Sequence, residues 1–167
     1  DHSGLLPRLA ARGFSGPVYA TPATIDLLGV MLPDSAHIHE MEFARAHEVE
    51  LRHGRRGARF PHRGGPRGDP VAAPLYTVAD AQRSLSLLAP VAYDRLFEPK
   101  ASIRFRFRDA GHILGSSIVE LWADIEGGAR KLVFSGDLGQ PGRPVMVDPT
   151  PIADADAVIV ESTYGNR

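Results

Sequence analysis

The sequence predicts a mixed α and β fold, in which helices come first along the chain and strands follow. Apolar residues in the first half recur at helical spacing behind residues that start helices, whereas from Ser102 onward they alternate with polar residues. The chain has no internal repeat, and its 167 residues suit one domain. A content of 43% apolar and 23% charged residues is ordinary for a globular protein.

The first elements are predicted from their start and stop signals. Residues 5–12 are expected to form a short helix and residues 17–20 a short strand. Thr21 is a typical N-cap, and Pro22 occupies the first position of a helix that runs to about Leu32.

Two further helices are predicted before the strands begin. One starts at Asp34, and the other at Thr77, whose capping box includes Asp80 in place of the usual glutamate. We expect the second of these helices to run to about Leu88 and to stop at Pro90. The first has a rough apolar stripe that consists of Ile38, Met41, Phe43, Ala46 and Val49.

The second half predicts a sheet. In residues 103–107 large apolar side chains alternate with arginines, as in a strand with one buried face. Residues 117–125 and 131–134 are predicted strands, joined by a turn at 126–128. Residues 157–160 are wholly apolar, which predicts a short strand buried on both faces.

The stretch between these halves, residues 52–68, is predicted to be a flexible basic loop. Residues 50–69 contain six arginines and five glycines, with no acid between the two ends. One interpretation is that it contacts phosphate groups, and the other, which we favour, is a solvated variable insertion. The candidate phosphate contacts are Arg52, Arg55, Arg56 and Arg59.

The amino-acid composition restricts the kinds of metal site and of partner that are expected for this chain. The absence of cysteine excludes disulfides and thiolate metal sites, so a metal would be held by histidine, aspartate or glutamate. A formal net charge of −1 does not indicate a polyanionic partner. No apolar run approaches the length of a membrane span, so we expect a cytoplasmic protein with no membrane contact.

Three glycine-rich segments follow predicted strands and contain residues able to bind metal. They are DAGHILGSS, SGDLG and ESTYGNR, and they contain His112, Asp137 and Glu161 respectively. Each residue also has an ordinary structural explanation, as a histidine bonded within its loop, a turn aspartate or an exposed acid at a strand end. The pair Asp1 and His2, at the start of the chain, is of the same metal-binding type.

In this order, the four segments resemble the motifs of the metallo-β-lactamase superfamily, and specifically of its β-CASP branch of RNA-processing nucleases. The segments YATPAT, at residues 19–24, and LPDSAH, at residues 32–37, resemble its bacterial members. The resemblance covers the chain apart from the basic loop. It implies a four-layer αββα sandwich, with two sheets face to face and helices outside.

The resemblance also implies a set of metal ligands for two Zn²⁺ ions. Asp1 and His2 match the last two positions of the motif His-x-His-x-Asp-His, which face the second zinc. His112 matches the histidine that completes the shell of the first zinc, and Asp137 matches the aspartate that bridges both ions.

Further roles are implied for two acids. Glu161 matches the acid that opens the β-CASP region and supports a catalytic histidine, and Asp109 is expected to orient a neighbouring ligand. The expected catalytic residues are Asp1, Asp137 and Glu161. Two zinc ions about 3.5–4 Å apart would hold a bridging hydroxide that attacks phosphorus.

The implied activity is hydrolysis of phosphodiester bonds in single-stranded RNA, by an endonuclease or a 5′-to-3′ exonuclease that forms a homodimer. One alternative is a hydrolase of a small ester, thioester or lactam, against which the segment ESTYG argues. A second alternative is a scaffold without catalysis, against which His112 and Asp137 weigh.

The expected domain organisation is a partial metallo-β-lactamase domain over residues 1–167. The first strands and the His-x-His half of the first motif are expected before residue 1, and the β-CASP domain after residue 167. We therefore expect the isolated chain to be inactive and to bind zinc poorly.

Overall fold

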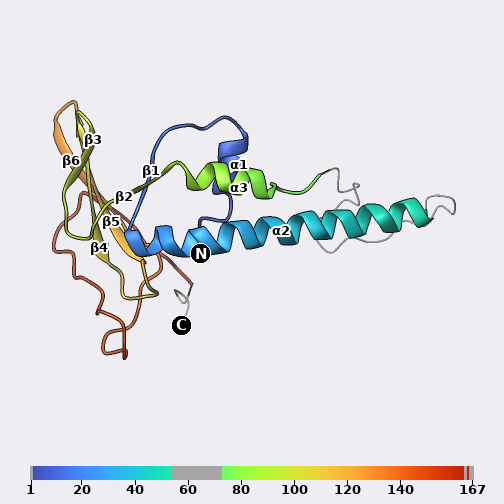
Figure 1. The fold of residues 1–167 in the computed structure, drawn as a ribbon. Coiled ribbons are helices and arrows are strands. Elements are labelled where there is room, and N and C mark those ends of the chain that lie inside the picture. Colours follow the sequence, from blue (N-terminus) through green and yellow to red (C-terminus); the bar gives the residue numbers. More distant parts are fainter. Residues whose placement is uncertain (1, 54–72, 164, 166–167) are drawn as a thin grey trace. The chain divides into compact units, whose positions relative to one another are not determined.

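A computed structural model describes residues 2–53, 73–163 and 165, and for residues 49–53 it describes the backbone only. The chain divides into two compact units, Asp1–Pro17 with Leu28–Leu87 and Val18–Leu27 with Leu88–Arg167. Helices and several strands are present, which confirms the mixed α and β class (Figure 1). None of the described helices combines the length and apolar composition needed to cross a membrane.

The first unit contains most of the helical structure. Helix α1 (Leu6–Ala11) begins with a proline in its first turn and packs against α3 (Val78–Leu85), and its position confirms the prediction. Helix α2 spans Pro22–His53, so it continues two residues into the predicted basic loop. The remainder of that loop lies outside the described residues.

The prediction of two separate helices at Thr21–Leu32 and from Asp34 is wrong, because α2 is continuous through Pro33. A proline inside a helix costs about 3 kcal/mol, since it removes a backbone hydrogen bond. Leu28, Leu32 and Ala36 are spaced by four residues on either side of this proline and are buried. Burying each leucine contributes about 1.5–3 kcal/mol. Burial of this face of the helix therefore offsets the cost of the proline.

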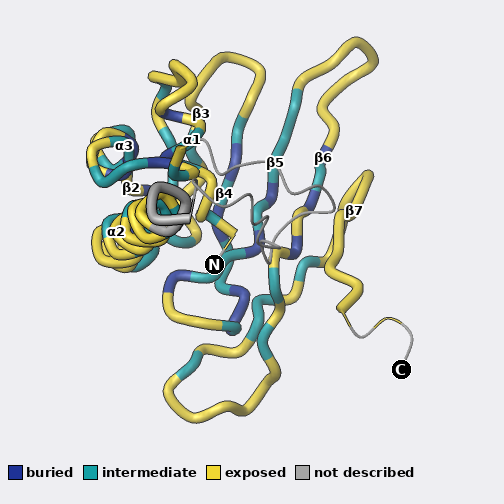
Figure 2. Tube along the Cα trace, turned by 90° about the vertical axis from the view of Figure 1, so that its right-hand side faces the viewer, coloured by how far each residue is buried: buried dark blue, intermediate teal, exposed yellow. Residues whose placement is uncertain are grey.

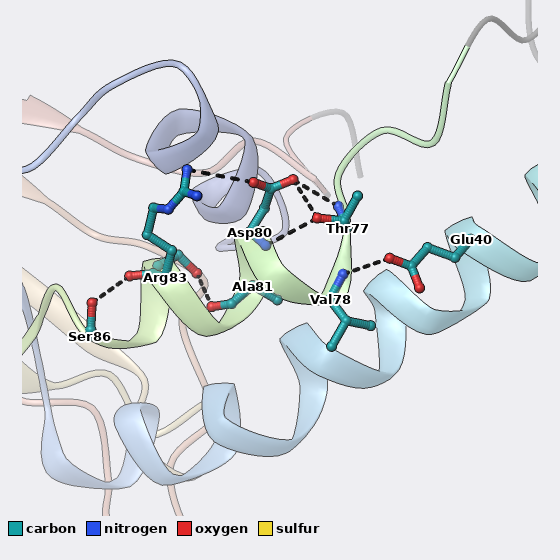
Figure 3. Close-up of polar contacts among 8 residues, drawn as sticks. Glu40, Thr77, Val78, Asp80, Ala81, Arg83 and Ser86 are labelled. Atoms are coloured by element: carbon teal, nitrogen blue, oxygen red, sulfur yellow. Dashed lines mark hydrogen bonds and ion pairs between the residues drawn. The ribbon is translucent and has the colours of Figure 1, made fainter.

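Helix α3 begins as its capping box predicts (Figure 3). The hydroxyl of Thr77 accepts a hydrogen bond from the Asp80 amide at 3.2 Å, and the Asp80 carboxylate accepts one from the Thr77 amide at 3.0 Å. Glu40 of α2 accepts another from the Val78 amide at 2.9 Å. These three bonds satisfy amides that no helical carbonyl can reach, and they place the start of α3 beside α2.

The predicted end of α3 at Leu88 is wrong. The helix ends at Leu85, and strand β2 (Leu88–Pro90) follows at once. Strand β2 pairs in parallel with β1 (Val18–Ala20), and the amide of Val91 donates to the carbonyl of Ala20 at 2.9 Å. Pairing with a strand about 70 residues earlier therefore overrides the local helical pattern.

The second unit contains a sheet with the strand order β3-β4-β5-β6-β7 (Figure 2). Strands β3 to β6 pair with their neighbours antiparallel, whereas β7 runs parallel to β6. The bounds are β3 Phe97–Lys100, β4 Ile103–Asp109, β5 Ser117–Ile125, β6 Gly128–Phe134 and β7 Ala157–Ile159.

Strands β4 and β5 lie where the alternating pattern predicts them, and β6 begins three residues earlier than expected. Strand β3 was not predicted, because the segment Phe97–Lys100 contains a proline and two charged residues. The prediction that residues 157–160 are buried on both faces is wrong, since β7 and Val160 are exposed. Within the described residues β7 pairs only with β6, so it lies at a sheet edge.

The sheet has a core on each face, and Figure 2 shows the buried positions in the middle of its strands. On one face Phe105 and Phe107 are buried with Val91, and the ring of Tyr19 from β1 lies 5.4 Å from that of Phe105. The other face contains a cluster of Ala110, Ile118 and Val133, covered by Ile152. Tyr19 thus joins the small parallel sheet to the large one. The four-layer sandwich of the family stays a prediction.

Candidate active site

The topology of the sheet brings three of the predicted site residues to one edge of the sheet, namely the edge at which β4, β6 and β7 end. Strands β4 and β6 are both antiparallel to β5, and β7 is parallel to β6. The carboxyl ends of β4, β6 and β7 therefore point the same way. His112 follows β4, Asp137 follows β6 and Glu161 follows β7.

His112 and Asp137 lie side by side across this edge. The Nε2 atom of His112 is 3.9 Å from the Oδ2 atom of Asp137, and the side chains are 37% and 24% exposed. This separation is longer than a direct hydrogen bond. The pair is therefore close enough to share a small ligand and open enough to receive one from solvent.

A glycine allows the two loops to approach this closely. The amide of Gly139 donates to the carbonyl of Ala110 at 2.8 Å. A Cβ atom at Gly139 would lie 1.8 Å from the carbonyl oxygen of Gly111 and 2.7 Å from the amide nitrogen of His112. Both contacts are with backbone atoms, so only glycine fits here without moving the loops apart.

Glu161 is bonded to the loop that carries Asp137. Its Oε1 atom accepts a hydrogen bond from the Leu138 amide at 2.8 Å, and its own amide donates to the Ser135 hydroxyl at 3.2 Å. Its Oε2 atom accepts from the Thr163 hydroxyl at 3.0 Å. The carboxylate thus ties the end of β7 to the loop that follows β6.

Asp109 acts on the backbone ahead of His112. Its Oδ1 atom accepts from the Gly111 amide at 2.8 Å, which closes a tight turn at the end of β4. Its carbonyl accepts from the Thr150 amide at 2.9 Å. The role predicted for Asp109, orienting a neighbouring ligand, stays a prediction.

Asp1, His2 and four arginines of the predicted basic loop complete the set of predicted site residues. Asp1 lies outside the described residues, and so do Arg55, Arg56 and Arg59. The backbone of Arg52 belongs to α2, and its side chain is not described. His2 is exposed and belongs to the first unit, whereas the His112 and Asp137 loops belong to the second.

The donor set fits part of a zinc site. Zinc bonds to histidine nitrogen and carboxylate oxygen are about 2.0–2.2 Å long, so two ligands of one ion lie at most about 4.3 Å apart. The 3.9 Å between His112 and Asp137 satisfies that limit. Within residues 2–53, 73–163 and 165, no group of three or more histidine, cysteine, aspartate or glutamate side chains is arranged to hold a metal ion.

Two supporting residues were missed by sequence reasoning. Ser116 accepts hydrogen bonds from the His112 loop, and Tyr93 donates from its hydroxyl to the Ser116 carbonyl at 2.8 Å. Burial raises the pKa of the Tyr93 hydroxyl, and the nearby Asp109 carboxylate raises it further, against a hydrogen bond with Thr21 that lowers it. The signal available in the sequence for Ser116 was a serine four residues after a loop histidine. No signal in the sequence pointed to Tyr93.

Comparison with known proteins gives relatives over the full chain. Ribonuclease TTHA0252 of Thermus thermophilus is 31% identical over 167 residues, which are 100% of this chain and 30% of that protein. Transcription termination factor FttA of Methanosarcina mazei is 29% identical over 168 residues, which are 99% of this chain and 22% of that protein.

The same factor from Thermococcus kodakarensis is 30% identical over 167 residues, with 99% of this chain and 21% of that protein covered. No family model matches the chain. The chain therefore spans less than a third of the length of the relatives it matches.

Proposed function

The chain belongs to the β-CASP branch of the metallo-β-lactamase superfamily, and from that premise we propose that its protein is a zinc-dependent ribonuclease. The observation that carries the proposal is the approach of His112 and Asp137 to 3.9 Å on two loops at one sheet edge. Glu161 lies on a third loop of that edge and is bonded to the second. The relative from Thermus thermophilus is itself named a ribonuclease.

His112 and Asp137 would hold zinc, together with Asp1 and His2. Zinc, when bound, supplies positive charge that stabilises the attacking and leaving oxygens of a phosphodiester. Asp137 is the carboxylate best placed to reach two ions, because it has two oxygens and lies next to the histidine. His112 would bind the metal through a nitrogen of its neutral imidazole.

Glu161 has two functions in this proposal. Its Oε1 atom holds the Leu138 amide and so fixes the loop on which Asp137 lies. Its carboxylate is the third acidic or basic group, after His112 and Asp137, at the edge where the phosphate would bind. There the carboxylate would support proton transfer to the leaving oxygen.

We propose single-stranded RNA as the substrate, cut by an endonuclease or a 5′-to-3′ exonuclease in the cytoplasm, with the whole protein acting as a homodimer. Salt dependence separates the two interpretations of the basic loop. Cleavage of RNA at low substrate concentration would weaken steeply with added salt if Arg52, Arg55, Arg56 and Arg59 contact phosphates, and would change little if the segment is the solvated insertion that we favour. Asp109 would keep the His112 turn in place.

The test is Asp137→Ala in the protein as its gene encodes it. Losing a zinc ligand removes several kcal/mol of transition-state stabilisation, so RNA cleavage should fall by about a thousandfold or more. Asp124→Ala is the matched control, because that aspartate is exposed on β5 and pairs with Arg104 at 3.0 Å. Its cleavage rate should stay near that of the wild type, and metal analysis should find less zinc only in Asp137→Ala.

Each other result has a definite meaning. RNA cleavage that survives Asp137→Ala would disprove the proposed site. A wild-type protein that hydrolyses a small ester, thioester or lactam but not RNA would establish the alternative substrate class. A wild-type protein that holds no zinc, and that cleaves neither RNA nor a small ester, thioester or lactam, would be a scaffold.

A further inference from the structure

We propose that Ser116 is a positioning residue for His112, whose hydroxyl fixes the backbone from which the imidazole reaches toward Asp137. The inference rests on the proposed function, since it concerns the same candidate zinc site. The Oγ atom of Ser116 accepts a hydrogen bond from the His112 amide at 3.1 Å and another from the Ile113 amide at 3.2 Å. One hydroxyl thus holds two consecutive amides of the loop.

Ser116 is itself held in place from the opposite side. Its carbonyl accepts from the Tyr93 hydroxyl at 2.8 Å and from the Ala110 amide at 3.4 Å, and its amide donates to the Ile113 carbonyl at 3.0 Å. Because the backbone of Ser116 is bonded on both of its polar groups, its hydroxyl has a defined position. That is what a residue needs in order to position another.

The residue before Ser116 is clamped as well. The carbonyl of Gly115 accepts from the hydroxyls of Thr21 and Thr24 at 3.0 and 2.9 Å. A Cβ atom at Gly115 would lie 2.6 Å from the Thr24 hydroxyl oxygen, and its φ of +87° also favours glycine. The end of the loop is therefore fixed against the start of α2, all within the second unit.

The middle of the loop has little packing of its own. The side chains of Ile113 and Leu114 are exposed, and the His112 side chain is itself only half-buried. Apolar burial therefore contributes little to the position of His112. The backbone of Gly115 and Ser116 fixes the end of the loop. The two hydrogen bonds to the Ser116 hydroxyl extend this fixed position to the backbone of His112.

Ser116→Ala would leave the two amides without this acceptor and let the loop backbone shift. Groups that orient metal ligands typically contribute about ten- to a hundredfold to metal affinity. We expect Ser116→Ala to lose zinc to a competing chelator at least about tenfold more readily than the wild type. Ser116→Thr keeps the hydroxyl and should restore most of the affinity.

The experiment measures zinc retention, the visible absorption of the Co²⁺-substituted protein and the unfolding temperature. Ser117→Ala is the matched control, since it removes the next hydroxyl along the chain, which does not bond the His112 amide. A changed Co²⁺ spectrum in Ser116→Ala, and not in Ser117→Ala or Ser116→Thr, would identify a shift at the metal rather than a general loss of structure.

Zinc retention and a Co²⁺ spectrum unchanged in Ser116→Ala would overturn the proposal. If that variant does not fold, Tyr93→Phe decides, because it removes the bond to the Ser116 carbonyl, together with a hydrogen bond to Thr21, and leaves the Ser116 hydroxyl in place. It should weaken zinc retention by a smaller factor, and unchanged retention would contradict the proposal. Zinc that is equally well held by Asp137→Ala would instead disprove the proposed function.

Discussion

Two clusters in the second unit bring acidic and basic side chains together, and they differ in how far they are closed to water. At the sheet edge, His112 and Asp137 are 3.9 Å apart and partly exposed. On the face of the sheet, Glu120 is 2% exposed and its carboxylate lies 2.7 Å from the Arg106 guanidinium and 2.8 Å from the Lys131 ammonium.

The cluster on the sheet face follows from register. Arg106 and Glu120 are direct partners across β4 and β5, and Lys131 is the partner of Trp122 across β5 and β6. The Arg106 and Lys131 charges lie 5.5 and 5.3 Å from the centre of the Trp122 ring. Every charge there has a partner at bonding distance, so a ligand would have to displace one of them.

Burial alone would raise the pKa of Glu120, but hydrogen bonds from Lys131 and Arg106 outweigh it and hold that pKa below its ordinary value. Burial also disfavours the charged form of Lys131 and by itself would lower the pKa of that side chain. Hydrogen bonds to Glu120 and Asp154 outweigh this effect, so the pKa of Lys131 is raised overall. The two clusters therefore show that closeness of charges does not identify a site. The structural cluster is buried around Glu120, whereas the pair at the strand ends is partly exposed to solvent.

The strongest test of this distinction is Glu120→Ala. Removing one partner of a buried ion pair leaves the others uncompensated, so the free energy of unfolding should fall by about 3–5 kcal/mol. Chemical denaturation measures this change. In the metal-free protein, Asp137→Ala should lower it by less than about 1 kcal/mol, because it removes a partly exposed loop side chain. Comparable losses in the two variants would erase the difference between the clusters.

The pH dependence of the unfolding free energy tests the role of Glu120 independently. A glutamate whose folded pKa is lowered contributes stability above its unfolded pKa of about 4.3, and that contribution is lost as the pH falls through the lower folded value. The wild type should therefore lose stability in acid more steeply than Glu120→Gln. Parallel curves would mean that Glu120 contributes no ionic stabilisation.

Gly139→Ala tests the edge site through its backbone. A methyl group 1.8 Å from the Gly111 carbonyl forces the Asp137 and His112 loops apart, which should cost about 1–3 kcal/mol of stability. RNA cleavage should fall by about a hundredfold, since a displacement of about 1 Å is enough for that loss. Gly29→Ala is the control, because its added Cβ meets no atom within 4 Å apart from the neighbouring backbone of its own helix. Full activity of Gly139→Ala would show that the loop spacing is unimportant.

The smallest effect concerns the first unit, in which a neutral hydroxyl and a carboxylate cap α3. Thr77→Ala removes the acceptor of the Asp80 amide and should cost about 1 kcal/mol of unfolding free energy. Thr77→Ser keeps the hydroxyl and should remain near the wild type. Thermal unfolding measures both, and RNA cleavage should be unchanged in each. An activity loss without a stability loss would contradict the purely structural role assigned to this cap.

Local chemistry was enough to predict several elements. The capping box at Thr77 and Asp80 determines where α3 begins, because its bonds are made within four residues. The alternation of phenylalanine and arginine determines β4 in the same way, since side chains of a strand point to opposite faces. The nomination of His112, Asp137 and Glu161 likewise needed only their residue types and glycine neighbours.

Long-range pairing decided what the local pattern could not. The sequence by itself determined the helix caps, the alternating strands and the chemical types at the strand ends. The tertiary structure alone decided that α2 continues through Pro33, that residues 88–90 form a strand and that β7 is exposed at an edge. It also set His112 3.9 Å from Asp137, because the direction of β4 and β6 depends on the strand between them.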